Sequence, residues 1–235
     1  MSIAPDILFE VAGFPVTNTV IATLITDLIL ILIVIFVNKT IALKPQGLQN
    51  IVEAGVDYFH GLVSEIAEKK TNFIFPWVMS FFLFIVISNL VAQFPGFESI
   101  RFSESPFLRA ATSDLNTTLA LATVSIIASN ALAIKHIGIK EYLKKFISFK
   151  MFPIFMFVGI LEFANELTKF ISFSFRLLGN IYAGERTLGE MYNLLPIGLP
   201  LPFMALELMV AIIQALVFAM LTMAFMHILS DKSAH

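Results

Sequence analysis

Five predominantly apolar stretches of this 235-residue sequence are each long enough to cross a lipid bilayer, which takes about 20 helical residues. Inside lipid, such stretches satisfy their backbone hydrogen bonds only as helices or as a closed β-barrel. The alternating strands of an outer-membrane barrel are absent. We therefore predict an all-α membrane protein forming a single polytopic domain, residues 1–235, whose last two helices are long and tilted. The predicted spans are 18–38, 73–94, 115–134, 152–190 and 201–229.

The composition agrees with a membrane protein and excludes several functions. Hydrophobic residues make up 58% of the chain and charged residues 14%, whereas soluble domains carry about 25% charged residues. A net charge of −2 with scattered basic residues argues against nucleic-acid binding. Without cysteine there is no disulfide framework, thiolate metal site or cysteine nucleophile. Residues 1–17 carry no Lys or Arg, unlike a signal peptide, so we expect the first span to remain in the mature protein.

The distribution of basic residues predicts the orientation in the membrane, because Lys and Arg in short loops are retained on the cytoplasmic side. Only Arg101 and Arg109 fall on one side of the predicted spans, and ten lysines fall on the other. Five spans then place the N-terminus outside and the C-terminus in the cytoplasm, and we expect a bacterial cell inner membrane. The ten lysines are Lys39, Lys44, Lys69, Lys70, Lys135, Lys140, Lys144, Lys145, Lys150 and Lys232.

Two connecting segments are predicted to carry amphipathic helical structure. Residues 47–70 place apolar side chains at helical spacing. This helix either lies in the membrane interface or forms a cytoplasmic helical hairpin packed on the rest of the chain. Residues 140–150 hold four lysines among aromatic residues, a pattern typical of a basic segment on an anionic leaflet. The alternative for this second segment is a topology signal only.

The predicted fourth span is too long for an upright helix. The 42 residues between Pro153 and Pro196 contain no proline, and as a helix they would reach about 60 Å, roughly twice the hydrocarbon thickness. Because amphipathic periodicity continues throughout, we predict one long, inclined helix. The alternative is a hairpin that folds back at one of three glycines. These are Gly179, Gly184 and Gly189.

A polar stripe along one face of this span is centred on Arg176. At 100° per residue, several small or polar side chains fall within about 40° of Arg176. A charge at mid-bilayer costs about 2.5–3.5 kcal/mol, so such residues usually face water or a partner and mark an ion path. A guanidinium keeps its proton, so Arg176 can attract and release a carboxylate but cannot carry a proton. The stripe comprises Glu162, Asn165, Lys169, Ser172, Asn180, Ala183, Thr187 and Glu190.

A structural role for Arg176 is the alternative. It would be an ion pair with Glu162, Glu166 or Glu207. The spacing of Glu162, Glu166 and Lys169 also suits a local salt bridge on the helix surface.

The fifth predicted span adds Glu207 and Gln214, which are seven residues apart and therefore share one helix face. A short loop makes the last two spans antiparallel, so Gln214 should lie at the depth of Arg176 and Glu207 at the depth of Glu185. Glu185 falls on the face opposite Arg176 and must serve a different surface. Glu185 and Glu190 could bind and release protons. We expect Gln214 to neighbour Arg176; alternatively, its hydrogen bond only holds two helices together.

The segment 174–185, SFRLLGNIYAGE, resembles the signature of subunit a of F-type ATP synthases. Three supporting segments occur in the family's order: PQGLQN at 45–50, DLNTTLAL at 114–121 and QALVF at 214–218. The resemblance covers nearly the whole chain. It implies a membrane stator subunit that provides two proton half-channels to and from a rotating c-ring and couples proton flow to rotation and ATP synthesis.

The resemblance also implies roles for individual residues. Arg176 would face the carboxylate of each rotor subunit and separate the half-channels. Some bacterial relatives carry His where this chain has Glu207, so the proton-handling pair here would be two carboxylates. The residues matching ion-translocation positions are Arg176, Asn180, Glu185, Glu207 and Gln214. Those expected at a channel entrance or lining are Asp114, Asn116, Glu162 and Glu190, although Asp114 could equally cap a helix N-terminus.

The expected partners are the rotor c-ring subunits, the peripheral-stalk b subunits, the rest of the F-type complex and membrane lipid, with no metal or cofactor. We expect the carried ion to be H⁺. A secondary transporter or ion channel with buried carboxylates is the first alternative, but no internal repeat supports it. A membrane enzyme is the second, but the sequence contains no His-Glu-x-x-His, Gly-x-Ser-x-Gly or phosphate-loop motif.

The purified chain should hydrolyse no ATP, because it carries no phosphate loop. Phosphate release from ATP by the purified chain in detergent checks this, with the complete ATP synthase as the positive control. Steady turnover by the chain alone would contradict the expectation of a non-catalytic subunit.

Overall fold

The computed structural model describes residues 5–11, 13–42, 47–67, 70–93, 101–102, 105–106, 109–144, 154–195 and 198–230, and most of these are helical. The helices are α1 (Asn18–Lys39), α2 (Leu48–Ala67), α3 (Thr71–Gln93), α4 (Leu115–Ile137), α5 (Ile139–Lys144), α6 (Ile154–Leu194) and α7 (Pro200–Ser230), with a 3-10 turn η2 (Ala111–Ser113) before α4. Two short antiparallel pairs join β1 (Ile7–Val11) to β2 (Phe14–Thr17) and β3 (Arg101–Phe102) to β4 (Ser105–Pro106). Apart from these pairs, the predicted all-α class is confirmed.

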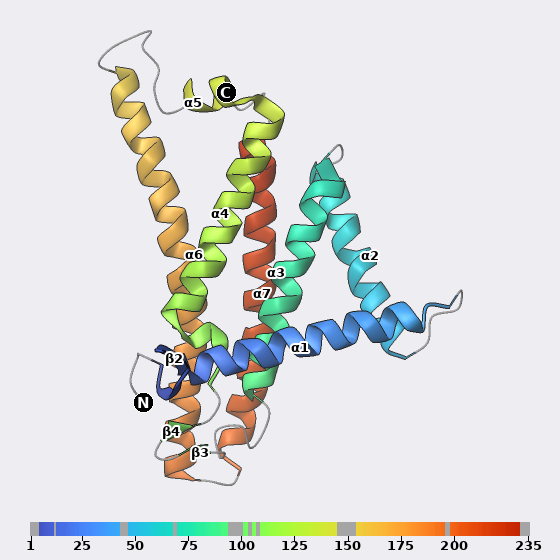
Figure 1. Cartoon of the computed structure of the whole chain (residues 1–235), viewed down its shortest axis with the longest axis vertical. Coiled ribbons are helices and arrows are strands. Elements are labelled where there is room, and N and C mark those ends of the chain that lie inside the picture. Colours follow the sequence, from blue (N-terminus) through green and yellow to red (C-terminus); the bar gives the residue numbers. More distant parts are fainter. Residues whose placement is uncertain are drawn as a thin grey trace.

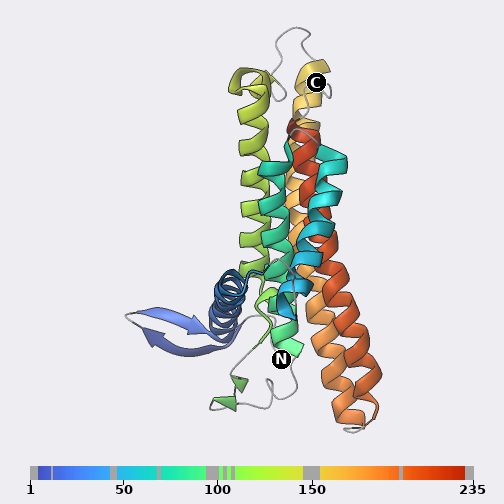
Figure 2. The same cartoon turned by 90° about the vertical axis from the view of Figure 1, so that its right-hand side faces the viewer.

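The helices α3, α4, α6 and α7 run along the long axis of the molecule (Figure 1). α2 lies against α3, and α6 and α7 extend together beyond the others at one end (Figure 2). α1 lies across this bundle and is seen end-on in Figure 2. The bundle therefore has one pair of helices, α6 and α7, whose lower turns protrude from the rest.

The predicted fourth span is a single helix. α6 runs without interruption for 41 residues, about 60 Å at 1.5 Å per residue. Gly179, Gly184 and Gly189 all lie inside it, since an isolated glycine costs only about 1 kcal/mol in a helix and does not break one. The hairpin alternative is therefore wrong.

Among the described residues, four helices are long and apolar enough to cross a bilayer: α1, α3, α4 and α7. They correspond to four of the predicted spans, and the chain is a multi-pass membrane protein. α6 corresponds to the remaining predicted span but is not in this group, since charged and polar side chains recur along it. The count of five spans therefore stays a prediction.

The connection between α2 and α3, helix α5 and the end of α7 lie at the same end of the bundle (Figure 1). This end carries Lys70, Lys135 and Lys140, which were predicted to share a side, and Lys70 Nζ donates to the Ser230 carbonyl at 2.7 Å. We call it the lysine-rich end and the opposite one the far end. Lys39, at the end of the transverse α1, lies away from this group. Which end faces the cytoplasm stays a prediction.

Two apolar clusters hold the bundle together. The first joins α2, α3, α4 and α7, and it buries Phe59, Ile74, Leu132 and Met223 to 2% exposure or less. The second joins α3, α4, α6 and α7. Because Phe59 of α2 belongs to the first cluster, residues 48–67 pack on the rest of the chain. Whether this helix lies in the membrane interface or in the cytoplasm stays a prediction. The second cluster comprises Phe81, Ile85, Ala122, Phe173, Leu177, Ala215 and Phe218.

Replacing Leu132 by Ala should lower the free energy of unfolding by about 2–5 kcal/mol, because it leaves a cavity where α2, α3, α4 and α7 meet. Thermal unfolding in detergent, followed by circular dichroism, measures this. Ile127→Ala on the same helix is the matched control, since Ile127 is 62% exposed and should change stability by less than about 1 kcal/mol. Equal effects of the two substitutions would contradict the described packing of α4.

Candidate functional site

A side-chain hydrogen bond joins the polar positions of α6 and α7. Asn180 Nδ2 donates to Gln214 Oε1 at 2.7 Å. Gln214 is buried, whereas Asn180 lies on the exposed side of α6. Gln214 was expected beside Arg176, but its hydrogen bond goes to Asn180, one helical turn further along α6. The predicted antiparallel match of the two helices is therefore correct to within one turn.

Arg176 lies on the exposed side of α6. No hydrogen bond or ion pair connects it to another residue that the structure describes. Glu166 instead pairs with Lys169 at 3.2 Å, as their spacing predicted. The alternative of a structural ion pair between Arg176 and Glu166 or Glu207 is therefore wrong, and the side chain of Glu162 lies outside the described residues.

The polar stripe predicted around Arg176 faces outward. Its exposed members follow α6 from Asn165, in the first third of the helix, to Glu190 near the far end. This face of α6 is therefore open to water or to a partner outside the chain. The exposed members are Asn165, Arg176, Asn180, Ala183, Thr187 and Glu190.

Glu207 lies buried between α7 and α6. Its position depends on Gly184, because a Cβ at residue 184 would lie 2.7 Å from Glu207 Oε1. Glu207 is 7% exposed and sits beside the residue that precedes Glu185, which confirms that the two carboxylates share a depth. Sequence analysis had not singled out this close approach, although a glycine directly before Glu185 was a signal for it.

A cavity of about 400 Å³ opens beside Glu207 between α3, α6 and α7. Its wall is mostly apolar, and Glu207 is the ionisable residue among those lining it. The volume is enough for several water molecules, each of which occupies about 30 Å³ in the liquid. A buried carboxyl group therefore borders a space large enough to hold water. The lining residues are Leu90, Gln93, Leu188, Met204, Ala205, Glu207 and Leu208.

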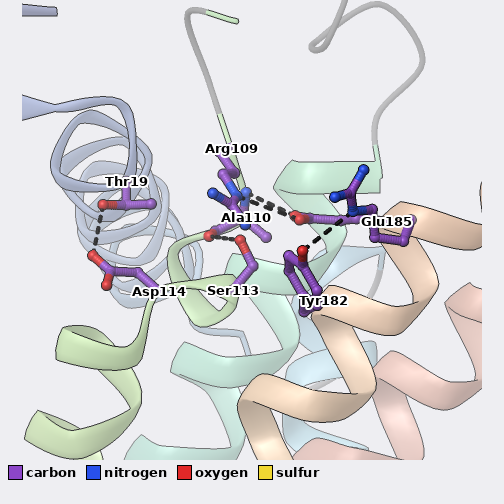
Figure 3. A network of polar contacts seen from close by, with 8 residues as sticks. Thr19, Arg109, Ala110, Ser113, Asp114, Tyr182 and Glu185 are labelled. Atoms are coloured by element: carbon purple, nitrogen blue, oxygen red, sulfur yellow. Dashed lines mark hydrogen bonds and ion pairs between the residues drawn. The ribbon is translucent and has the colours of Figure 1, made fainter. Parts of the chain in front are cut away.

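Glu185 points away from Arg176, as its position on the helix predicted, and is held by the segment before η2 (Figure 3). Arg109 Nε lies 3.5 Å from Glu185 Oε2, and the Ala110 N–H donates to Glu185 Oε1 at 3.3 Å. The two charged side chains are only 6% and 10% exposed. Such a desolvated pair is stable only with good geometry and further hydrogen bonds, and the Ala110 amide supplies one.

Sequence analysis used Arg109 only as a topology marker and missed this contact. Two signals pointed to it. Arg109 is one of only two basic residues on its predicted side, and it stands five residues before Asp114, where the motif 114–121 begins.

Asp114 is the N-cap of α4. Its Oδ1 accepts the Asn116 N–H at 2.9 Å and its Oδ2 accepts the Thr19 hydroxyl at 2.9 Å. The capping alternative is thus confirmed. The same carboxylate also fixes the first turn of α1 to the start of α4, while Asn116 remains exposed. Whether either residue lines a channel entrance stays a prediction.

Comparison with known proteins decides the family. Residues 19–227 match the family model described as ATP synthase A chain. The chain belongs to the ATP synthase subunit a family. It is 30% identical to ATP synthase subunit a of Moorella thermoacetica over 223 residues, 95% of each chain. It is 33% identical over 220 residues to the sodium ion specific ATP synthase subunit a of Propionigenium modestum, covering 92% of this chain and 74% of that relative.

A third relative extends the same pattern. ATP synthase subunit a 2 of Bradyrhizobium sp. is 29% identical over 219 residues, which cover 93% of this chain and 91% of that protein. In this member of the subunit a family, the polar residues of α6 form two groups on opposite faces. Arg176 belongs to the outward group, and Glu185 belongs to the inward group together with Glu207 of α7.

Replacing Gly184 by Ala should displace the Glu207 carboxylate, because the new Cβ would lie 2.7 Å from Glu207 Oε1. We expect ATP-driven acidification of inverted vesicles to fall at least about tenfold, since Glu207 is predicted to translocate ions and a 1 Å displacement of such a group can cost about a hundredfold. Gly189→Ala is the matched control, because nothing lies within 4 Å of a Cβ there.

The double variant Gly184→Ala/Glu207→Asp should recover part of the rate, because Asp is one methylene shorter. Recovery would tie the defect to crowding of Glu207. An undiminished rate in Gly184→Ala itself would contradict a requirement for this close approach.

Proposed function

We propose that this chain is the membrane stator subunit of an F-type ATP synthase. It provides two proton half-channels to and from a rotating c-ring, and it couples proton flow to rotation and ATP synthesis. The observation that carries the proposal is Arg176, an exposed guanidinium on a membrane helix with no partner among the described residues. A carboxylate on a neighbouring, moving subunit is the partner that this position fits.

The outward face of α6 is suited to a rotor subunit. Gly179 and Ala183 lie exposed near Arg176, and small residues allow a second helix to approach closely in a membrane. Asn180 adds a hydrogen-bonding group one turn from Arg176. A rotor carboxylate could therefore reach the guanidinium, exchange its proton nearby and move on.

The inward groups supply a path from the far end. The cavity beside Glu207 leads water to a carboxyl group, and the Gln214–Asn180 hydrogen bond continues the polar line across α7 and α6 towards the level of Arg176. Glu185 belongs to the same polar region. We assign ion translocation to these residues with Arg176. Asp114, Asn116, Glu162 and Glu190 are assigned to the entrances or the lining.

A stator with an arginine barrier also fits the energetics. One charge crossing about 100 mV releases roughly 2.3 kcal/mol, so several ions must be combined to make one ATP, and a rotor does this. A continuous pore would dissipate the gradient. Arg176 opposes direct passage because its positive charge repels protons between the half-channels, while each rotor carboxylate finds a counter-charge there.

The remaining assignments follow from this function. ATP chemistry takes place on other subunits, the c-ring and the peripheral-stalk b subunits are the partners, and the carried ion is H⁺. The chain lies in a bacterial inner membrane with its N-terminus outside and its C-terminus in the cytoplasm.

Arg176→Ala should abolish ATP-driven acidification of inverted vesicles while the complex still assembles, as judged by co-purification of rotor and stalk subunits. Arg186→Ala is the matched control, because Arg186 lies on the same helix but donates to the Tyr182 hydroxyl at 3.2 Å. It should keep most of the activity. An assembled Arg176→Ala complex that pumps normally would disprove the proposal. Repeating the assay with and without Na⁺ tests whether the carried ion is H⁺, as proposed, or Na⁺.

A further inference from the structure

Helix α1 exposes an acidic side chain in the middle of an apolar surface. It is the most hydrophobic of the four candidate spans, and Asp27 is its acidic residue. Asp27 is exposed, and no hydrogen bond or ion pair joins it to another residue in the part of the chain that the structure describes. A carboxylate in apolar surroundings needs compensation, so this position requires an explanation.

The side of α1 that packs on the bundle is not the side that carries Asp27. The buried residues contact η2 and α3, and Thr19 donates to Asp114 at 2.9 Å. None of the residues 27–39 is buried, and this half of α1 extends past α3 and away from α6 (Figure 1). The large apolar side chains of α1 therefore face outward. The buried residues are small or polar: Asn18, Thr19, Ala22 and Thr26.

Asp27 belongs to a line of exposed side chains along α1. The other members are Val20, Leu24, Ile31 and Val34, which are 44–64% exposed. Successive members are alternately four and three residues apart, which is the spacing of the seam between two packed helices. A helix is also the partner that satisfies its own backbone hydrogen bonds inside lipid. A second helix packed along this line would cover Asp27 together with its apolar neighbours.

The chemistry of Asp27 specifies what the partner helix carries. Asp27 is the tenth of the 22 residues of α1, so it lies about 14 and 18 Å along the axis from the two helix ends. Its side chain is too short to extend its charge to either end, as a lysine can. A second copy of α1 aligned on the same line would bring two carboxylates together, and like charges repel. A basic side chain opposite Asp27 meets the requirement.

We infer that a helix of a stationary subunit of the complex packs along this line of α1 and places a Lys or Arg side chain against Asp27. A rotor subunit does not fit, because one fixed polar contact in an apolar seam sets a single partner and register. The surface lies away from Arg176. The inference therefore goes beyond the proposed function, and binding rather than ion transport judges it.

Photo-cross-linking in native membranes tests the location of the partner. p-Benzoylphenylalanine replaces Leu24 or Ile31, which flank Asp27 by one turn, and mass spectrometry identifies the adducts in the assembled complex. We expect both positions to cross-link to one stationary subunit, close to a Lys or Arg of its membrane helix. Phe36 is the matched control position. It is 54% exposed but lies 180° from Asp27, and the adduct should be lost there.

Adducts with lipid alone, with the rotor, with a second copy of this chain or with a helix that lacks a basic residue would each overturn the inference.

Asp27→Leu tests the charge, with Asp27→Glu as the control that keeps it. Asp27→Leu should lower co-purification of the cross-linked subunit with this chain at least about tenfold, a factor equivalent to about 1.4 kcal/mol. The reason is that the basic residue of the partner is left buried and unpaired. Asp27→Glu should retain most of the partner. If lipid covered this side of α1, Asp27→Leu would retain the partner fully, and the inference would be wrong.

A charge exchange keeps the test decisive if Asp27→Leu fails to accumulate in the membrane. Asp27→Lys is combined with replacement of the cross-linked basic residue of the partner by Asp. Recovery of co-purification in the exchanged pair, relative to Asp27→Lys alone, supports the charge pair, and no recovery overturns it. Arg176→Ala judges the proposed function separately, since its readout is pumping by a complex that has assembled.

Discussion

A charge on a helix inside a bilayer needs water or an opposite charge, and the arrangement of this molecule follows from how α6 meets that requirement on two faces. On the inward face, Glu185 finds Arg109 at 3.5 Å, within the chain. On the outward face, Arg176 finds no partner among the described residues. One helix therefore carries a charge that is compensated within the chain and another that no described residue compensates.

The length and continuity of α6 allow one helix to carry both the outward and the inward charged residues. An unbroken helix of 41 residues holds Arg176, Asn180 and Glu185 at constant angles and heights. α7 runs beside it and contributes Gln214 and Glu207, which meet α6 one turn apart, at Asn180 and at Gly184. Gly184 permits the closest of these contacts. The polar groups of α7 thus meet α6 at two neighbouring turns.

The short segment from Arg109 to Asp114 has a larger structural role than its length suggests. It contacts α6 through Glu185, α3 through Asn89 and α1 through Thr19. Each of these contacts is polar and buried, so none can be broken without leaving a costly unsatisfied group. The segment consequently links Glu185 of α6 to α3 and α1. A shift of any of these three helices would therefore alter the contacts of Glu185.

The sequence by itself determined the helices and the faces of α6. Apolar runs located α1, α3, α4 and α7, the absence of proline kept α6 whole, and a rotation of 100° per residue placed Glu185 opposite Arg176. These features depend on local spacing. Tertiary structure alone decided that Gln214 binds Asn180 instead of Arg176, because the spacing of residues within each helix does not reveal a shift of one turn between two helices. It also decided that α1 lies across the bundle and that Arg109 reaches Glu185, because both depend on the path of loops between helices and on which buried charges meet there.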